Sequence, residues 1–271
     1  MKLITSRENA LYKEFKQLAT SAGARRKLGR TLLDGVHLCE VFLQQRGLPL
    51  FCVVSESGRQ HAEVAALLAR CHEVCIVLPD ALYQALSQVE HGVGLFFVIE
   101  LPGFSGLGAD GAGSGQALDS IPALQQNAVL LDNVQDPGNL GSILRSAAAA
   151  GIKQVWCSPG TAQAWSPKVL RAGMGAHFLL NIIEQVDLLM LVQHAAIPVI
   201  ATSSYASQTL YQLDLQQPVA WLFGHEGQGV DPALLAASPC QISIPHLGQM
   251  ESLNVAACAA VCFFEQCRQN L

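Results

Sequence analysis

Residues 131–151, LDNVQDPGNLGSILRSAAAAG, decide the fold because they join the end of an apolar strand to a helix through a short polar loop. Within this loop Asp136 is followed directly by Pro137. This pair predicts a helix start, since the carboxylate can cap free backbone N–H groups and proline loses no hydrogen bond at the first helical position. Strand, loop and helix in this order are typical of one step in a parallel α/β sheet.

The same alternation of apolar strands and helices continues to the C-terminus. Strands are predicted at 127–134, 154–158, 178–184, 198–204, 218–224 and 240–245, and helices at 138–151, 166–175, 187–195, 231–238 and 252–267, the last capped near Glu251 or Ser252. Apolar strands alternating with helices predict a parallel sheet covered on both faces. Ligands of such sheets bind beyond the carboxyl ends of the strands, so we expect a site in the loops after Val134, Ser203, Gly224 and Pro245.

The first hundred residues predict a separate, smaller α/β domain. Helices are expected at 6–20, with Ser6 as the cap, at 36–46 and at 61–70, and strands at 31–33, 48–55, 73–79 and 94–100. A glycine-rich linker at 101–125 then leads to the second domain, 126–271. This linker contains the spacing Gly106-x-Gly108-x-x-Gly111 of a dinucleotide-binding loop, but no helix opens directly after it, which favours the linker interpretation.

The composition excludes several classes of protein. Apolar residues make up 51% of the chain and charged residues 14%, which excludes wholesale disorder. No stretch reaches the roughly 18 uninterrupted apolar residues of a membrane-spanning helix, and the N-terminus lacks a secretory signal. The nine cysteines lack the paired spacing of a tetrahedral zinc site. We therefore expect a cytoplasmic protein with reduced thiols, no metal ion and no membrane partner.

Positive charge is concentrated at the N-terminus. The first thirty residues hold eight basic and two acidic side chains, a balance of +6, whereas the whole chain carries −5 and the remainder therefore −11. A basic patch on an acidic body is compatible with binding of RNA phosphates, although a solvated surface would have the same composition. The candidate RNA-binding residues are Arg7, Lys13, Arg25, Arg26, Lys27 and Arg30.

The helix that follows the first loop contains a single, isolated charged residue. Arg145 is the only charged residue between Asp136 and Lys153, in a helix otherwise rich in alanine. An arginine that such a helix buries requires a partner, so it either meets a ligand or forms a core or intersubunit salt bridge. Asn139 lies in the first turn of the same helix.

Two further loops bring glycines and polar groups to the same edge of the predicted sheet. In WLFGHEGQGV (221–230), the glycines allow a tight turn around Glu226, while His225 is either structural or a general base. In IPHLGQMESLNV (244–255), Ser252 and Asn254 lie where the N-terminus of the last helix favours a polar ligand. These residues predict a glycine-lined ligand site without identifying the ligand.

The segments DPGNLGSILRSA, FGHEGQG and IPHLGQMESLNV resemble, in this order and spacing, the three motifs of the SpoU/TrmH-type RNA 2′-O-ribose methyltransferases of the SPOUT superfamily. The resemblance covers about residues 126–271. The basic start and LLDGVHLCEVFL are similar, more weakly, to the substrate-binding domain of rRNA-modifying members.

The resemblance implies a particular fold, partner and cofactor. The fold would be α/β, with a trefoil knot in the C-terminal parallel-sheet domain and a small L30e-like N-terminal domain. The active unit would be a homodimer. The cofactor would be S-adenosylmethionine, held chiefly by backbone groups at Thr202, Gly224, Ile244 and Leu253, and the catalytic residues would be Arg145, Asn139, Glu226, Ser252 and Asn254.

The reaction implied is methyl transfer to a ribose 2′-hydroxyl. Arginine is a poor general base, so we assign Arg145 to electrostatic stabilisation of the developing alkoxide. The separate basic domain favours rRNA over tRNA as the substrate. The alternatives are a tRNA 2′-O-methyltransferase, a non-catalytic RNA-binding protein that kept the knot and, on the linker glycines alone, a nucleotide-dependent oxidoreductase.

Overall fold

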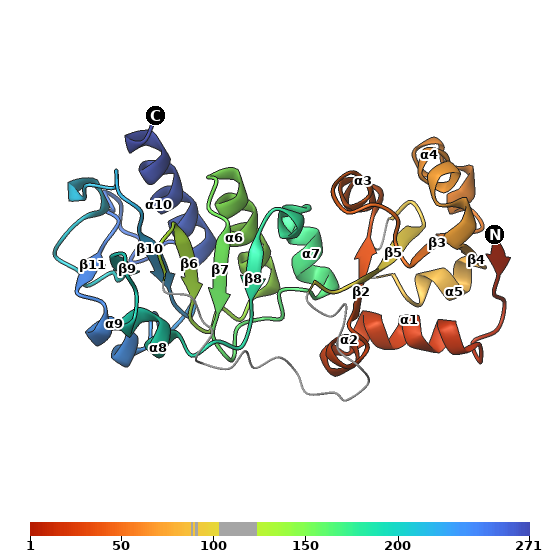
Figure 1. The fold of residues 1–271 in the computed structure, drawn as a ribbon, viewed down its shortest axis with the longest axis horizontal. Coiled ribbons are helices and arrows are strands. Elements are labelled where there is room, and N and C mark those ends of the chain that lie inside the picture. Colours follow the sequence, from red (N-terminus) through yellow and green to blue (C-terminus); the bar gives the residue numbers. More distant parts are fainter. Residues whose placement is uncertain (88, 90–91, 103–123) are drawn as a thin grey trace. The chain divides into compact units, whose positions relative to one another are not determined.

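The computed structural model describes residues 1–87, 89, 92–102 and 124–271, and these form two compact units (Figure 1). The described part of unit 1 comprises residues up to 102 together with Trp165–Phe178, and that of unit 2 comprises 124–164 and Leu179–Leu271. The predicted linker at 101–125, with its Gly106, Gly108 and Gly111, lies almost entirely outside the described residues.

The described residues of unit 1 form a five-stranded mixed sheet in the order β1-β4-β3-β5-β2. The strands β1, β3 and β4 run parallel, whereas β5 is antiparallel to both of its neighbours. The strand bounds are β1 Lys2–Leu3, β2 Arg30–Asp34, β3 Phe51–Ser55, β4 Cys75–Leu78 and β5 Leu95–Glu100. The last four confirm the predicted strands, and β1 is too short for a sequence pattern to reveal.

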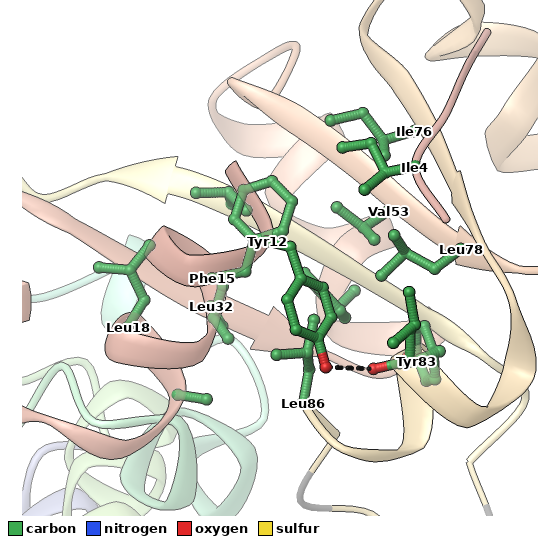
Figure 2. Packing of buried hydrophobic residues seen from close by; sticks show 14 residues of the cluster. Ile4, Tyr12, Phe15, Leu18, Leu32, Val53, Ile76, Leu78, Tyr83 and Leu86 are labelled. Atoms are coloured by element: carbon green, nitrogen blue, oxygen red, sulfur yellow. Dashed lines mark hydrogen bonds between the residues drawn. The ribbon is translucent and has the colours of Figure 1, made fainter. Parts of the chain in front are cut away.

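Helices cover this sheet and complete its core. They are α1 Ala10–Thr20, α2 Ala22–Leu28, α3 Val36–Gln45, α4 Ala62–Arg70, α5 Asp80–Gln84 and α7 Pro167–Gly173, with short 3-10 turns at Gly58–Gln60, His72–Val74 and Ala176–Phe178. Figure 2 shows α1 directing Tyr12 and Phe15 into the core. The Phe15 ring centroid lies 5.7 Å from that of Phe51 and 6.0 Å from that of Phe96. The Tyr12 hydroxyl donates to the Leu82 carbonyl at 3.3 Å.

The predicted Ser6 cap of α1 is wrong. The helix begins at Ala10, and the Asn9 side chain accepts the Leu11 N–H at 3.0 Å. Ser6 instead accepts the Glu8 N–H in a turn that precedes the helix. Both residue types cap helices well, so the sequence alone could not choose between them.

The segment that contains α7 belongs to unit 1, although it follows β7 of unit 2 in the chain. The Thr31 hydroxyl donates to the Trp165 carbonyl at 2.7 Å, and the Arg46 guanidinium donates to the Phe178 carbonyl at 3.1 Å. The rings of Phe42 and Phe178 pack edge to face with centroids 5.4 Å apart. These long-range contacts are not apparent in the local sequence pattern.

The described residues of unit 2 form a six-stranded sheet in the order β11-β9-β10-β6-β7-β8, and every pairing is parallel. The strands are β6 Ala128–Leu131, β7 Gln154–Cys157, β8 Asn181–Ile183, β9 Val199–Thr202, β10 Ala220–Phe223 and β11 Cys240–Ile242. The predicted parallel sheet is therefore confirmed. Phe223 pairs in register with Leu131, so β6 and β10 end at the same level and their loops emerge together.

The helices of unit 2 are α6 Pro137–Ala149, α8 Leu188–Gln193, α9 Pro232–Ala237 and α10 Val255–Gln269, with a 3-10 turn at Leu210–Gln212. The predicted Asp136 cap of α6 is confirmed, since its carboxylate accepts the Asn139 N–H at 2.8 Å. The predicted cap of α10 at Glu251 or Ser252 is wrong, because the helix begins later, at Val255.

Helix α10 packs beside α6 and is anchored by buried polar groups (Figure 1). The Trp221 indole N–H donates to the Gln266 side-chain carbonyl at 2.9 Å, and the Gln266 amide donates to Asn127 Oδ1 at 2.9 Å. Each polar atom that the packing buries here thus has a partner. The opposite side of α10 leaves Phe264 with 51% of its surface exposed, so in the single chain the helix is not buried all round.

All nine cysteines lie in the described part of the chain, and none forms a disulfide. Six of them are buried, as expected for thiols that pack as small apolar side chains. Among the helices of the described residues, none combines the length and the apolar character needed to cross a membrane.

The cap of α1 yields a test of the fold. Replacing Asn9 by alanine should lower the free energy of unfolding by about 0.5–2 kcal/mol, because the Leu11 N–H loses its acceptor. Ser6→Ala is the matched control and should have a smaller effect, since Ser6 accepts only in the preceding turn. Urea denaturation followed by circular dichroism measures both, and a larger loss in Ser6→Ala would contradict the assigned cap.

Candidate active site

The carboxylate of Glu226 joins the loop after β10 to the loop after β6. It accepts the backbone N–H groups of Gln135 at 3.3 Å and Asp136 at 3.1 Å, and the Asn139 side-chain amide at 3.0 Å. All three donors lie just before α6 or in its first turn. One charged acceptor therefore holds the start of this helix against the glycine-rich loop.

The hydrogen-bond chain continues from Asn139 to the last helix. Asn139 donates to Glu226, so its Oδ1 is free to accept, and the Asn254 amide donates to that oxygen at 2.8 Å. Asn254 Oδ1 in turn accepts the N–H groups of Ala256 and Ala257, which caps α10. Each amide is thus oriented by its neighbours. Three of the five predicted catalytic residues, from three separate loops, are in direct contact.

The ionisation of Glu226 follows from these contacts. Partial burial alone would raise its pKa, but the hydrogen bonds from Asn139 and from the backbone outweigh burial and lower the pKa below its ordinary value. Glu226 is therefore anionic at neutral pH and acts only as an acceptor.

Gly224 and His225 shape the loop that carries Glu226. A Cβ atom on Gly224 would lie 2.2 Å from the carbonyl carbon of Gly229, so only glycine fits there. His225 and Gly229 exchange backbone hydrogen bonds at 2.9 and 2.8 Å. The His225 Nδ1 atom accepts the N–H groups of Gly227 and Gln228, which supports the structural role of this histidine rather than that of a general base.

Asp132 is a residue of the site that the sequence reasoning missed. It directly follows β6, and its Oδ2 atom accepts the Asp231 N–H at 2.9 Å while Oδ1 accepts the Ser158 hydroxyl at 3.3 Å. It therefore ties the end of β6 to the loops after β7 and β10. Its position at a carboxyl strand end was the signal that could have identified it.

The four predicted cofactor-binding residues lie at the same edge of the sheet. Thr202 ends β9 half-buried, and its hydroxyl donates to the Leu222 carbonyl of β10 at 3.3 Å. Gly224 is buried, Ile244 is half-buried after β11, and Leu253 precedes the α10 cap with 43% of its surface exposed. Thr202, Gly224 and Ile244 thus lie at or just after the ends of three neighbouring strands.

Arg145 and Ser252 do not join the Glu226 network. Arg145 lies six residues beyond Asn139 on α6, about 9 Å along the helix axis, and its side chain is exposed. Within the described part of the chain it takes part in no ion pair. Ser252 is exposed in the loop before α10.

The six candidate RNA-binding residues differ in their burial and in their ion pairs. Arg25 is only 5% exposed and donates to the Leu18 carbonyl at 2.7 Å, so burial removes it from the candidate RNA-binding residues. Arg30 pairs with Glu14 at 2.6 Å, and Lys13 pairs with Glu8. Of the six candidate residues, Arg7, Arg26 and Lys27 are exposed and form no ion pair among the described residues.

The site offers amide, hydroxyl and backbone groups rather than a set of metal ligands. Within the described ranges, no three histidine, cysteine, aspartate or glutamate side chains gather as a metal ion would require.

Comparison with known proteins places this site in a family. The model of the SpoU rRNA methylase family matches residues 126–264, which include all three loops. The chain is 34% identical to an uncharacterised tRNA/rRNA methyltransferase of Synechocystis sp., over 98% of this chain and 94% of the relative. It is 30% identical to the 23S rRNA (guanosine(2553)-2′-O)-methyltransferase RlmP of Bacillus subtilis, over 96% of this chain and 97% of the relative.

Solved structures agree with the sequence relatives. An RNA 2′-O ribose methyltransferase superimposes with a TM-score of 0.79 and 28% identity, covering 98% of each chain. An AdoMet-bound rRNA methyltransferase from Sinorhizobium meliloti shares the fold, with a TM-score of 0.79 and 24% identity over 100% of this chain and 98% of that one. The match over the three site loops and the likeness along nearly the whole chain show that the protein belongs to the SpoU rRNA methylase family.

Proposed function

We propose that the protein transfers a methyl group from S-adenosylmethionine to a ribose 2′-hydroxyl of rRNA. The observation that carries this proposal is the contact of Glu226, Asn139 and Asn254, which joins the three family loops at the carboxyl edge of the parallel sheet. The Bacillus subtilis relative, similar along nearly its whole length, is a 23S rRNA 2′-O-methyltransferase.

The residues at the strand ends fit S-adenosylmethionine as the cofactor, which would supply the methyl group. Gly224 lets the loop after β10 fold back on Gly229 with no side chain in the way, and Thr202, Ile244 and Leu253 lie in neighbouring loops at the same edge of the sheet. Backbone N–H and C=O groups recognise an adenine edge by hydrogen bonding without a charged side chain.

Arg145 is the group that we assign to the reacting oxygen. The 2′-hydroxyl becomes more nucleophilic as its proton leaves, and a guanidinium beside it stabilises the developing negative charge. The exposed guanidinium of Arg145, which no carboxylate of the described chain neutralises, is suited to meet an RNA ribose or phosphate. Ser252, exposed in the loop before α10, would help to orient the ribose.

Glu226 and Asn254 act as positioning residues in this scheme. The Glu226 carboxylate already accepts three hydrogen bonds, and its lowered pKa makes it a weak base. Its role is to orient the Asn139 side chain. The Asn139 oxygen then accepts the Asn254 amide, and Asn254 caps the start of α10. The loop that ends in Leu253 is thereby held in place for the cofactor.

We also propose that the protein is a homodimer and that the sheet domain of each subunit is knotted. Exposed Phe264 on α10 supports a second subunit, which would bury this ring and could carry Arg145 to the neighbouring site. The family resemblance supports a trefoil knot formed by the chain after β9. Unit 1, with its mixed sheet and basic N-terminal residues, would be an L30e-like domain that binds RNA.

Transfer RNA is the alternative substrate, because the relative from Synechocystis sp. is named a tRNA/rRNA methyltransferase. Mapping 2′-O-methylation across total RNA, with and without the protein, decides between the two. A missing methyl group in 23S rRNA supports the proposal, and one in tRNA supports the alternative.

Replacing Arg145 by alanine tests the reaction directly. Methyl transfer to RNA should fall by about 10²–10³-fold, the usual effect of losing one oxyanion-stabilising group, while cofactor affinity stays within twofold. A radiolabelled methyl assay and calorimetry with S-adenosylmethionine measure these two quantities. Lys153→Ala, which removes the exposed cation that next follows α6 in the chain, is the control and should keep full turnover. Turnover retained in Arg145→Ala would refute the role of this arginine.

The lowered pKa of Glu226 predicts a pH dependence of stability. The folded-state pKa lies below the unfolded value of about 4.3, so the stabilisation is fully present above that pH and is lost as pH falls through the folded-state pKa. Glu226→Gln should flatten the loss of stability with acid in this window, whereas Glu251→Gln, an exposed glutamate of the loop before α10, should leave it unchanged. Urea titrations between pH 3 and 6 check this, and identical slopes for wild type and Glu226→Gln would count against it.

Salt dependence tests the RNA-binding surface. Replacing both Arg26 and Lys27 by alanine should weaken rRNA binding and lower the slope of log K against log salt by about 1.4–1.8, since each phosphate contact contributes about 0.7–0.9. Fluorescence anisotropy with a labelled rRNA fragment at several salt concentrations gives both values. An unchanged slope would show that these two cations do not contact phosphate, and Lys153→Ala again serves as the control.

A further inference from the structure

Unit 1 contains a cavity of about 320 Å³ that the proposed reaction does not use. Its volume lies within the range of small-molecule pockets, about 300–1,000 Å³. The lining combines one end of α3, the chain that follows it, the end of β5 and the α7 segment: Phe42, Arg46, Leu48, Pro49, Leu50, Ile99, Glu100, Leu101, Pro102, Trp165 and Phe178.

Three aromatic rings form part of the wall and are held firmly. Phe42 and Phe178 pack edge to face with centroids 5.4 Å apart, and the Trp165 ring packs against His177 at 5.2 Å. The main chain at Trp165 and Phe178 is fixed by the Thr31 and Arg46 hydrogen bonds. Phe42, Trp165 and Phe178 are only 7–8% exposed, so they form a rigid wall that needs little ordering when a ligand enters.

Two charged side chains border the same cavity. Arg46 is exposed, and among the described residues its guanidinium, which has five N–H donors, donates one hydrogen bond, to the Phe178 carbonyl. Glu100 is exposed at the end of β5, and although Arg30 lies opposite it in the strand register, the Arg30 guanidinium pairs with Glu14. The cavity therefore offers an aromatic wall, a carboxylate acceptor and guanidinium donors together.

We propose that this cavity binds an unpaired guanine base of the RNA. Single-stranded bases are recognised by stacking on aromatic side chains and by hydrogen bonds to their Watson–Crick edges. Guanine presents two adjacent donors on that edge, N1–H and N2–H₂, which match the two oxygens of the Glu100 carboxylate. Arg46 then donates to the O6 atom or to the adjoining phosphate. That the base belongs to RNA rests on the proposed function, whereas the preference for guanine rests on the cavity alone.

Tryptophan fluorescence reports on this cavity in the full chain. The protein has three tryptophans, and Trp156 and Trp221 are 1% and 0% exposed in the core of unit 2. Trp165 is the tryptophan that lines the cavity, so binding of guanosine 5′-monophosphate at millimolar concentrations should quench the fluorescence of Trp165 and leave that of the other two unchanged. The quenching should disappear in Trp165→Phe, while calorimetry still detects binding because an aromatic face remains. Failure of the nucleotide to bind at 10 mM by either method would overturn the proposal.

Nucleotides with other bases and a substitution of Glu100 test whether the cavity recognises guanine. Inosine monophosphate, which lacks N2–H₂, should bind about tenfold more weakly than the guanosine nucleotide, and adenosine and cytidine monophosphates more weakly still. Glu100→Gln should lose about tenfold in affinity for the guanosine nucleotide and erase the preference, whereas Glu73→Gln, at an exposed glutamate elsewhere in unit 1, should not. Equal binding of all four nucleotides would refute the assignment to guanine.

Activity separates this proposal from the proposed function. In the methyl-transfer assay Glu100→Gln should raise KM for RNA and leave kcat unchanged. If wild type methylates RNA but binds no guanosine nucleotide, the cavity proposal fails alone. If it binds the nucleotide but methylates no RNA, the proposed function fails and guanine recognition by the cavity stands.

Discussion

The carboxylate of Glu226 supports the geometry of the whole site. It is an anion with three donors, two from the backbone before α6 and one from Asn139. Because Asn139 must turn its N–H₂ group toward this carboxylate, its oxygen faces Asn254, and Asn254 then caps α10 with its own oxygen. If the side-chain amide of Asn139 or Asn254 were flipped, two donors or two acceptors would face each other. The positions of three loops are thereby fixed by a single charge.

The parallel sheet makes this chain of contacts possible. Strands β6 and β10 are neighbours with their ends in register, and β9 and β11 follow on the same side, so loops far apart in sequence emerge together. Gly224 allows the β10 loop to close on itself, and Asp132 ties that loop back to β6. Polar side chains stay oriented here because every loop is fastened to the sheet as well as to its neighbour.

Unit 1 depends on a different kind of contact. Its core is apolar and aromatic, and the unit includes a segment, Trp165–Phe178, that the chain supplies between two strands of the other unit. Carbonyl groups of Trp165 and Phe178 receive their hydrogen bonds from Thr31 and Arg46. The cavity beside them exists only because these distant segments meet.

The sequence by itself determined the elements and much of the site. Runs of apolar residues predicted the strands, helical spacing predicted the helices, and the Asp136-Pro137 pair predicted the start of α6, because these signals lie within a few neighbouring residues. The predicted grouping of Asn139, Glu226 and Asn254 rested on the rule that the loops at the carboxyl ends of parallel strands lie together, whereas their catalytic roles rested on the family resemblance. Only the tertiary structure decided between Asn9 and Ser6 as a cap, placed Arg25 in the core and packed the α7 segment into unit 1. The place of the α7 segment depends on contacts between residues far apart in the chain, and the α1 cap and the burial of Arg25 depend on how α1 and α2 pack, which local propensity does not encode.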